Sequence, residues 1–295
     1  MGRITRRAPA RRVTLGEHGP IVDGRADTLA VEEPLEIRVD DAAVTVTMRT
    51  PGDDFDLALG WLHAEGHIAA AADVRTLMHC NDTDEDGRPT FNVVDVTPAP
   101  GVVFDITPRA STTTSACGMC GAQSIADTRR RSRYDLRDDR TTFDPALLSG
   151  LPHRLRERQP GFARTGGLHA AGIVDATGEP LCVREDVGRH NAVDKVIGWA
   201  LRQELLPLRG CVLVVSGRAG YELAQKAVLA GIPAMVSVSA TTSLAVELAR
   251  ESGLTLASFV RGDRLTIYSD AGRVVGLDPA FSAGSQGPPK GITQA

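Results

Sequence analysis

The stretch CVLVVSGRAGYELAQKAVLAGIPAMVSV, residues 211–238, decides the fold class of this chain. It begins with a continuous apolar run, continues with apolar residues at helical spacing, and ends with a second apolar run. Continuous apolar runs are typical of strands that are buried on both faces, and a helix between two of them is the connection that parallel strands require. We therefore expect an α/β fold with a parallel sheet covered by helices on both faces.

The same alternation extends to both sides of this stretch. Downstream, the helical segment SLAVELARESG (243–253) is followed by a third apolar run, LTLASFV (254–260). Upstream, AVDKVIGWALRQELL (192–206) predicts a helix with one apolar stripe, and GGLHAAGIVDATGEPLCVREDV (166–187) predicts a hairpin. These elements belong to one larger domain.

A different pattern precedes this domain. Residues 34–50, PLEIRVDDAAVTVTMRT, alternate apolar and polar side chains around Asp40–Asp41, which predicts a half-buried hairpin. Residues 53–66 predict a helix that packs on this hairpin, and residues 74–98 predict two further strands around a polar turn. The predicted order β-β-α-β-β is that of a small α+β roll.

Composition and pattern divide the chain into four parts. Residues 1–19 are rich in arginine and lack the apolar stretch of a secretory signal, so we predict a flexible basic arm. The small α+β domain spans residues 20–108 and the larger α/β domain residues 109–278. The polar tail, residues 279–295, is predicted to be disordered.

The overall composition excludes several classes of protein. A formal net charge of -4 provides no global positive field, so we expect no nucleic-acid partner. Charged residues interrupt every apolar run before the length of about 18 residues that a membrane span needs, so we expect no membrane partner. Five cysteines, an odd number, argue against a disulfide framework and for a reducing cytoplasm.

The motif CGMCG, residues 117–121, is the strongest chemical signal in the chain. A helix-compatible run, AQSIADTRR (122–130), follows it, and a thiol near a helix N-terminus and arginines is favoured as a nucleophilic thiolate. Three interpretations of Cys117 and Cys120 stay open at this point: half of a structural zinc site, a dithiol redox pair, or a carrier of persulfide sulfur.

The remaining cysteines and histidines limit the zinc interpretations. A structural zinc site normally has four protein ligands, but Cys80, Cys182 and Cys211 are isolated, and we expect the last two to be small core residues. A zinc nucleobase deaminase needs an H-x-E motif before its C-x-x-C. Neither His67 nor His79 has a glutamate two positions later. No metal site is therefore predicted.

A second constellation, REDVGRHNAVDK (184–195), stands where a predicted strand ends and a helix begins. Asn191 is predicted to be the N-cap of that helix, with Asp194 three residues on. Arg189 and His190 then lie at a helix N-terminus after a glycine, a position that suits a phosphate group. A capped helix with solvated charges is the simpler alternative.

Two further turns follow predicted parallel strands. Ser216, Gly217 and Arg218 follow one strand, and Ser237 and Ser239 end the next. Because the carboxyl ends of parallel strands meet at one edge, where open α/β sheets bind ligands, we predict a nucleotide-phosphate site there. The chain contains no G-x-x-x-x-G-K-[ST] motif, so hydrolysis of ATP or GTP has no support.

Taken together, these segments resemble the formate dehydrogenase accessory sulfurtransferases, the FdhD family. The resemblance extends over roughly residues 20–275 and rests on SACGMCG, GGLHAAG, EDVGRHNAVDKVIGWAL, SGRAGYELAQKA, AGIPAMVSVSATTSLAVELA and LTLASFVRGDRLTIYS, in that order. It implies that the larger domain is a cytidine deaminase-like three-layer αβα domain without zinc, beside the smaller β-β-α-β-β roll.

The resemblance also implies a function. Such a protein is a cytoplasmic sulfurtransferase that accepts sulfur from a cysteine desulfurase as a cysteine persulfide. It passes the sulfur to the molybdenum (or tungsten) bis-pterin guanine dinucleotide, its bound substrate, before that cofactor enters the formate dehydrogenase catalytic subunit. GDP is the expected mimic, a homodimer is the expected assembly, and the family's sulfur-carrying cysteines map onto Cys117 and Cys120. The cofactor-binding residues we then predict are Arg189, His190, Asn191, Ser216, Gly217, Arg218, Ser237 and Ser239.

This chain departs from the family pattern at Gly220, where a small hydroxyl residue is usual, and its loop before the CGMCG motif is less aromatic. Two other functions stay open. A non-catalytic chaperone would bind and deliver the cofactor with its C-x-x-C serving only redox control or docking. A dithiol oxidoreductase would act on generic disulfides, although the expected preceding strand is missing.

Overall fold

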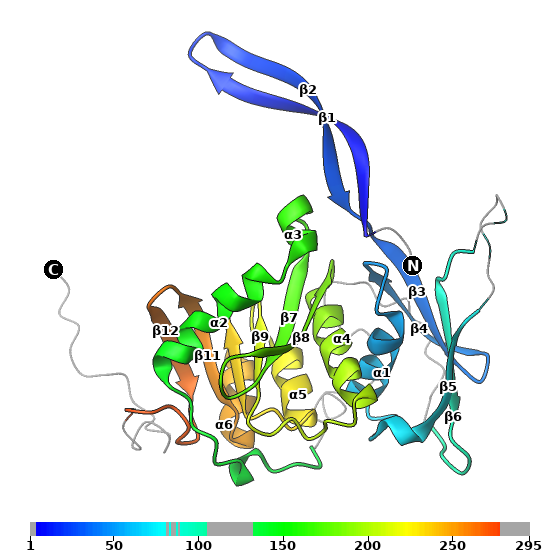
Figure 1. Ribbon diagram of the computed structural model, residues 1–295, viewed down its shortest axis with the longest axis vertical. Helices are drawn as coiled ribbons and strands as arrows, with labels where there is room; N and C mark the ends of the chain where they lie inside the picture. Colours follow the sequence, from blue (N-terminus) through cyan, green and yellow to red (C-terminus); the bar gives the residue numbers. More distant parts are fainter. Residues whose placement is uncertain (1–3, 81–82, 84–86, 88, 105–131, 278–295) are drawn as a thin grey trace.

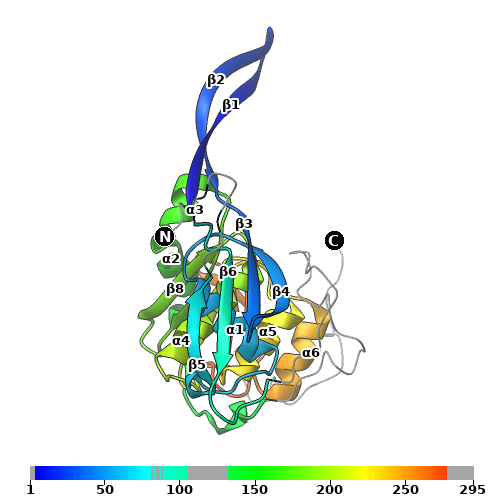
Figure 2. The same cartoon turned by 90° about the vertical axis from the view of Figure 1, so that its right-hand side faces the viewer.

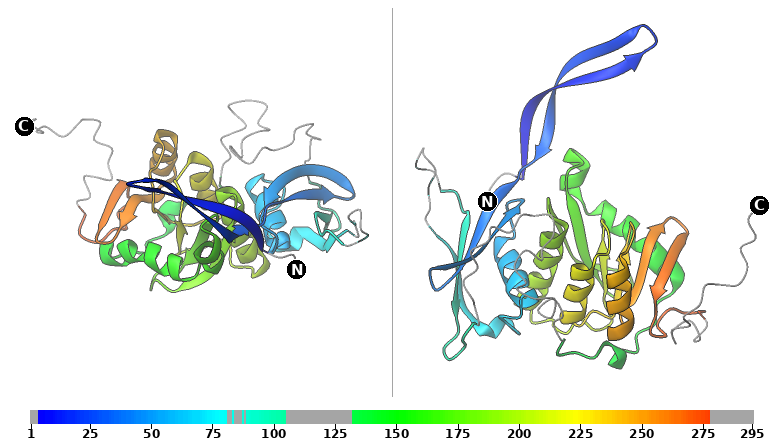
Figure 3. Two further views of the ribbon diagram at one scale, coloured as in Figure 1. Left: turned by 90° about the horizontal axis from the view of Figure 1, so that it is seen from above. Right: turned by 180° about the vertical axis from the view of Figure 1, so that it is seen from behind.

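The computed structural model describes residues 4–80, 83, 87, 89–104 and 132–277. Within these residues the strands form three sheets, of two, six and four strands. The four-stranded and six-stranded sheets lie side by side with helices α1 and α4 between them, and the two-stranded sheet projects from one end (Figures 1 and 3).

The six-stranded sheet has the order β12-β11-β10-β9-β7-β8. Its strands are β7 (His169–Val174), β8 (Pro180–Asp186), β9 (Val212–Val215), β10 (Ala234–Ser237), β11 (Thr255–Arg261) and β12 (Arg264–Ser269). As predicted from the apolar runs, β9, β10 and β11 are parallel. The pairs β7-β8, β7-β9 and β11-β12 are antiparallel, so β7 and β12 run opposite to the other four strands. The short connections within β7-β8 and β11-β12 do not allow a parallel crossover.

Helices cover both faces of this sheet, as expected. The helices α4 (Arg189–Arg202), α5 (Tyr221–Leu229) and α6 (Ser243–Ser252) lie on one face, and α2 (Pro145–Glu157) lies on the other (Figure 1). Alternate residues of β9 serve the two layers: Leu213 packs with the α4 and α5 side, whereas Val212 packs with α2. The α/β fold class is confirmed, while the closer likeness to a cytidine deaminase stays a prediction.

The sequence patterns did not predict α2 or the short helix α3 (Pro160–Thr165). Pro145 and Pro152 both lie in α2, and proline normally ends a helix. Pro145 is tolerated in the first turn, and the Asp144 side chain accepts a hydrogen bond from the Ala146 amide. Burial of Leu148, Leu151 and Leu155 against the sheet then stabilises the helix.

The four-stranded sheet confirms the predicted β-β-α-β-β order. It contains β3 (Glu33–Val39), β4 (Ala42–Arg49), β5 (Val74–His79) and β6 (Val93–Pro98), in the order β4-β3-β6-β5. Helix α1 (Asp54–Ala64) follows β4, and short 3₁₀ turns lie at Ala71–Asp73 and, in the larger unit, at Leu136–Asp138. The predicted hairpin turn has positive φ angles of 47° at Asp40 and 65° at Asp41, as a tight two-residue hairpin turn requires.

Helix α1 packs against α4 so closely that two contact positions leave no room for a side chain. A Cβ atom added at Gly60 would lie 1.9 Å from the Asp194 carbonyl oxygen, and one at Gly198 would lie 1.8 Å from that of Asp56. One continuous hydrophobic cluster accordingly runs from β3 through α1 and α4 to β9. The two predicted domains therefore share a core.

The prediction of a flexible basic arm is wrong for residues 5–16. They form strand β1 (Thr5–Gly16), which pairs along its full length with β2 (Gly19–Ala30). The predicted boundary at residue 19 falls in the turn between them, where Gly19 has a φ of 117° that suits glycine. Backbone pairing needs no apolar pattern, so the arginine-rich sequence concealed it. The predicted disordered tail, residues 279–295, lies outside the described residues.

No helix among the described residues is long and apolar enough to cross a membrane.

Candidate functional site

Four strands of the six-stranded sheet bring the predicted site residues to one edge. β8, β9 and β10 end at this edge, and β7 begins there, because His169 pairs with Asp186 and Ala171 pairs with Val215. We call this edge the rim; it comprises His169 and the loops 186–191, 216–221 and 237–242.

Contacts between the loops confirm that the predicted turns lie together at the rim. The Ser237 hydroxyl lies 3.2 Å from the Gly217 carbonyl oxygen and 2.8 Å from that of Ser239. The Ser216 hydroxyl accepts a hydrogen bond of 2.9 Å from the Ala170 amide. An added Cβ at Gly217 would lie 3.4 Å from His169 Nδ1. The loops therefore form one surface.

Ser237 lies beneath this surface and helps to hold its loops in place. Its side chain is fully buried, and its hydroxyl lies within hydrogen-bond distance of one carbonyl oxygen in its own loop and one in the 216–221 loop. A side chain without exposed surface does not contact a ligand, so we assign Ser237 to loop positioning instead of phosphate binding. Ser239 is partly exposed and keeps its place among the candidates.

Arg189 and Arg218 supply positive charge at the rim. Arg218 is exposed, Arg189 is half-buried, and an added Cβ at Gly217 would lie 3.7 Å from Arg189 Cδ. Within the described part of the chain, neither guanidinium forms an ion pair with a carboxylate. Guanidinium groups that are not neutralised in this way suit the bidentate binding of phosphate.

His190 differs from these arginines, since it has an anionic partner. Its Nε2 lies 2.9 Å from Glu222 Oε2 of α5, and both side chains are largely buried. The pair joins the first turn of α4 to the first turn of α5. The carboxylate orients the ring, and a hydrogen-bonded imidazole in this position is suited to donate a proton to a bound ligand.

His169 is a rim residue that the sequence reasoning missed as a site residue. Burial lowers the pKa of its imidazole from the ordinary 6.5, and the nearby charges of Arg189 and His190 lower it further, while Asp186 opposes them. The imidazole is therefore neutral at pH 7 and can exchange hydrogen bonds without adding charge. Only the pairing of β7 with β8 and β9 brings it to the rim.

The predicted N-cap at Asn191 is wrong. Helix α4 begins at Arg189 with Gly188 as its N-cap, so Asn191 lies within the first turn and is buried. Its amide nitrogen donates to the Met48 carbonyl oxygen at 2.7 Å and to Asp186 Oδ1 at 3.1 Å. Asn191 therefore holds α4 to β4 and does not face a ligand.

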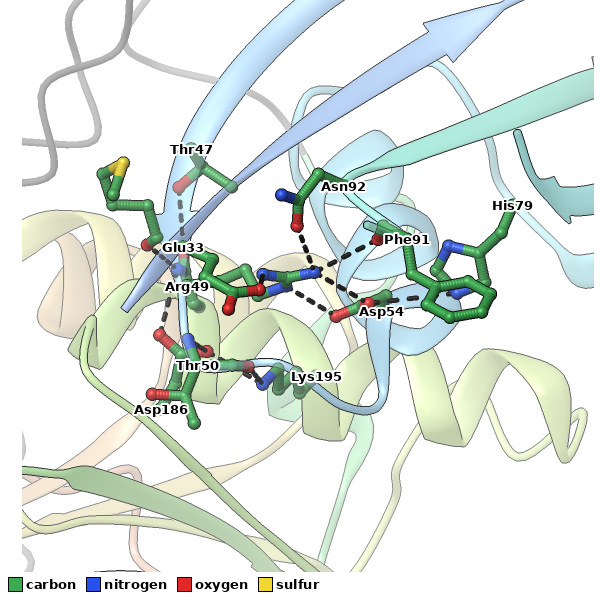
Figure 4. Close-up of polar contacts among 12 residues, drawn as sticks. Glu33, Thr47, Arg49, Thr50, Asp54, His79, Phe91, Asn92, Asp186 and Lys195 are labelled. Atoms are coloured by element: carbon green, nitrogen blue, oxygen red, sulfur yellow. Dashed lines mark hydrogen bonds and ion pairs between the residues drawn. The ribbon is translucent and has the colours of Figure 1, made fainter. Parts of the chain in front are cut away.

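Asp186 and Lys195 also connect α4 to the end of β4 (Figure 4). Their side chains are almost fully buried and 2.8 Å apart. Lys195 Nζ donates to the Thr50 carbonyl oxygen at 2.8 Å, and the Thr50 amide donates to Asp186 Oδ2 at 3.1 Å. The motif 184–195 is thus partly structural, because Asp186, Asn191 and Lys195 hold the rim to the end of β4 and the β4-α1 loop.

A second buried network holds the start of α1. Arg49 forms a bidentate pair with Asp54, with distances of 2.9 and 3.2 Å. It also donates to the Phe91 carbonyl oxygen and to Asn92 Oδ1, each at 3.2 Å (Figure 4). Because Arg49 is almost fully buried, these acceptors are needed to compensate its desolvation.

The described cysteines confirm the predicted core role of Cys182 and Cys211. Burial raises the pKa of the Cys182 thiol to about 12 and that of the Cys211 thiol to about 11, so neither forms a thiolate at neutral pH. Cys117 and Cys120 lie outside the described residues. Within the described ranges, no three His, Cys, Asp or Glu side chains are grouped so that they could hold a metal ion.

Known proteins resemble this chain over most of its length. The model of the FdhD/NarQ family matches residues 30–275. A "Sulfur carrier protein FdhD" from Mycolicibacterium paratuberculosis is 55% identical over 267 residues, which are 90% of this chain and 97% of the relative. One from Streptomyces coelicolor is 52% identical over 277 residues, which are 93% of this chain and 97% of the relative.

A solved structure has the same fold. The crystal structure of a putative formate dehydrogenase accessory protein from Desulfotalea psychrophila superimposes with a TM-score of 0.68. The match covers 91% of this chain and 99% of that one at 21% sequence identity. At this identity the likeness supports the fold alone.

Proposed function

Because this chain belongs to the FdhD/NarQ family, we propose that it is a sulfur carrier, a sulfurtransferase that serves the maturation of a formate dehydrogenase in the cytoplasm. The observation that carries the proposal is the division of its cysteines. Cys182 and Cys211 are buried with raised pKa values, and Cys80 is partly exposed but has no second cysteine near it in the sequence, so the paired thiols to be tested are those of the CGMCG motif, Cys117 and Cys120. Relatives at 50% identity and above are named sulfur carriers.

Sulfur enters by exchange between a thiolate and a persulfide. The Cys117 thiolate attacks the outer sulfur of the persulfide on a cysteine desulfurase, and the donor's sulfur-sulfur bond breaks. The donor cysteine leaves as a thiolate, and Cys117 becomes a persulfide. No electrons are gained or lost overall in this step.

Sulfur leaves by one of two routes. In the direct route the sulfur-sulfur bond breaks, Cys117 leaves as a thiolate, and the reduced metal of the substrate supplies the two electrons that bring the outer sulfur to the sulfide level. In the other route the Cys120 thiolate attacks the inner sulfur and releases the outer one as hydrosulfide, which replaces a ligand of the metal. The second route leaves a disulfide between Cys117 and Cys120, which a cellular dithiol must reduce before the next cycle. In both routes the acceptor is the metal of a molybdenum or tungsten bis-pterin guanine dinucleotide, which is the substrate.

The rim is the proposed binding surface for this substrate. Arg189 and Arg218 would hold phosphate oxygens, because no described carboxylate pairs with them. His190, oriented by Glu222, would donate to a phosphate or to a departing metal ligand. Ser216, Gly217 and Ser239 shape the surface, and GDP is the simplest probe for it. The loaded cofactor would then pass to the formate dehydrogenase catalytic subunit.

Mass spectrometry after incubation with cysteine and a desulfurase tests the sulfur-carrying role. We expect an increment of about 32 Da on the peptide that contains residues 117–120. The Cys117→Ala/Cys120→Ala variant should lose the increment, and Cys182→Ala should keep it. If the double alanine variant restores full formate dehydrogenase activity in cells lacking the native protein, the chain is a cofactor chaperone and the sulfur-transfer proposal is wrong.

A further inference from the structure

His169 is a polar side chain of the rim for which the described residues supply no hydrogen-bond partner. It opens β7 directly after α3, at the end of the molecule from which the β1-β2 hairpin projects (Figures 1 and 2). Its side chain is half-buried, and neither ring nitrogen forms a hydrogen bond within the described ranges. Buried polar groups are normally paired, so an unpaired imidazole at a binding surface indicates that a ligand supplies the partner.

Gly217 places His169 beside Arg189. A Cβ atom added at Gly217 would lie 3.4 Å from His169 Nδ1 and 3.7 Å from Arg189 Cδ. Because glycine has no Cβ, a ligand that packs on the backbone of residue 217 comes within reach of both side chains. Arg189 is a proposed phosphate-binding residue, so a phosphate that it holds lies close to the imidazole.

The charges around His169 favour the neutral imidazole as long as no ligand is bound. Burial lowers the pKa of His169 from 6.5, and the charges of Arg189 and His190 lower it further. Asp186 acts in the opposite direction, but its carboxylate is already paired with Lys195 at 2.8 Å. The ring is therefore neutral at pH 7 in the free protein.

The other charged groups on neighbouring elements do not compensate a charge on His169. Glu222 of α5 faces His190 at 2.9 Å, and Glu185 of β8 accepts hydrogen bonds of 2.7 Å from two amides of α3. Arg218 of the 216–221 loop is exposed and adds positive charge. In the described part of the chain, no carboxylate forms an ion pair with His169.

A bound phosphate reverses this balance. It brings negative charge next to Arg189, and an opposite charge within about 4–6 Å of an ionisable group favours its charged form. Its oxygens also accept hydrogen bonds, which are stronger when the donor is an imidazolium. A permanent third cation would repel Arg189 and His190 in the empty site, whereas a proton that arrives with the ligand does not. His190 differs, because Glu222 compensates its positive charge before a ligand binds.

We propose that His169 is a third phosphate-binding group of the rim: it takes up one proton from the solvent when a phosphate binds at Arg189, and the imidazolium then donates a hydrogen bond to that phosphate. The proton joins the unprotonated ring nitrogen, and no other covalent bond forms or breaks. This inference rests on the proposed function, because the rim is its binding surface.

Nuclear magnetic resonance of the full chain with carbon-13-labelled histidine rings tests the proton uptake. The chain contains seven histidines, and His169→Gln identifies the signal of His169 by its loss. Sulfate is the first probe, because its charge does not change over the range of the titration and every proton taken up is then bound by the protein. Without sulfate the pKa of His169 should lie below 6.5. Saturating sulfate should raise this pKa by about one pH unit or more.

His153 is the matched control for this titration. It is exposed on α2, away from the rim, and sulfate should leave its titration unchanged. His169→Asn provides the same assignment of the His169 signal if the glutamine variant does not fold, and circular dichroism of each variant checks folding.

GDP binding tests the hydrogen bond that follows the proton uptake. Because the phosphate itself takes up a proton near about pH 6, affinities are compared between variants at each pH. His169→Gln should bind GDP at least about threefold more weakly than the unsubstituted chain at about pH 6, where the imidazole of the complex is protonated. At about pH 8.5, where the imidazole is neutral, the two affinities should agree within about twofold. His153→Gln should match the unsubstituted chain at both pH values.

Arg189→Ala tests the link between the arginine and the imidazole. Without this guanidinium the pKa of His169 in the free protein should rise, because the Arg189 charge is one of the causes that lower it. The same variant should lose most of the response to sulfate, because the anion is no longer held beside the ring. Arg158→Ala, on the α2 side, should change neither quantity.

The outcomes separate this inference from the proposed function. If sulfate and GDP bind but leave the pKa of His169 unchanged, the inference is wrong and the rim is still the binding surface. Equal weakening of GDP binding by His169→Gln at both pH values would also overturn it, because a structural role does not depend on the proton. If neither sulfate nor GDP binds, the inference fails together with the rim, whereas the mass increment on residues 117–120 still reports on sulfur transfer.

Discussion

The buried pair of Asp186 and Lys195 makes a stringent test of how the rim is held. Lys195→Met removes an ion pair of 2.8 Å and a hydrogen bond of 2.8 Å to the Thr50 carbonyl oxygen. The Asp186 carboxylate then remains buried, but it keeps three donors: the amides of Thr50 and Gly188 and the Asn191 side chain. Removal of one partner from a buried pair costs about 3–5 kcal/mol. Because three donors remain, we expect a loss of about 3 kcal/mol, the lower end of this range.

The reverse change should cost more. In Asp186→Asn, the Lys195 ammonium keeps only the Thr50 carbonyl oxygen at 2.8 Å and that of Glu185 at 3.5 Å. The NH2 group of the new asparagine is itself a donor, and it would replace a carboxylate oxygen that accepts hydrogen bonds from neighbouring donors. We expect a loss of about 4–5 kcal/mol. The double variant Asp186→Asn/Lys195→Met should lose less than the sum of the two single variants, because it leaves no unpaired buried charge.

Urea unfolding followed by circular dichroism measures these free energies. Arg202→Met is the matched control: it removes an ion pair of the same 2.8 Å length from the same helix α4, but the arginine is about half exposed. Its loss should be below about 1 kcal/mol. If Lys195→Met costs no more than Arg202→Met, the structural assignment of Lys195 is wrong. If Lys195→Met also abolishes GDP binding at unchanged stability, Lys195 contacts the ligand.

Three other expectations follow from the same contacts. Gly198→Ala should destabilise the protein by more than about 3 kcal/mol in the same assay, because its Cβ would meet the Asp56 carbonyl oxygen, whereas Gly220→Ala, with open space around it, should cost under about 0.5 kcal/mol. Burial raises the pKa of Asp139, but hydrogen bonds from Thr141 and Gly210 outweigh burial and hold that pKa below 3.8. The stability that this carboxylate contributes is therefore present above about pH 4 and is lost as the pH falls further. Between pH 7 and pH 2, the free energy of unfolding should fall less in Asp139→Asn than in the unchanged protein. Calorimetric titration with GDP should show at least tenfold weaker binding for Arg189→Ala and unchanged binding for Arg158→Ala on the α2 side; equal affinities would remove the rim from the proposal.

Local pattern was enough for most of the large sheet and the small roll. The continuous apolar runs of β9, β10 and β11, the striped helices after them, and the Asp40–Asp41 turn all depend on neighbours within a few residues. Burial on both faces or on one stripe leaves its period in the sequence, so these elements were predicted correctly. The core positions of Cys182 and Cys211 followed from the same periodicity.

Elements stabilised by distant partners were not predicted. Helix α2 contains two prolines, and the sheet beneath it provides the burial that compensates for them. The arm follows backbone pairing, which has no side-chain period of its own. The Asn191 side chain prefers carbonyl and carboxylate partners from β4 and β8 to the cap position that its local sequence offered.

The sequence by itself therefore determined the strands and helices whose apolar faces show in its periodicity, the exclusion of hydrolytic phosphate loops, and the family. Tertiary structure alone decided which polar residues of the rim stay exposed and which become its supports. Ser237, Asn191, Asp186 and Lys195 are of the same chemical kinds as the ligand-binding candidates. Because burying an unpaired polar group is unfavourable, each of these four side chains forms a hydrogen bond with a protein group that is distant in the sequence.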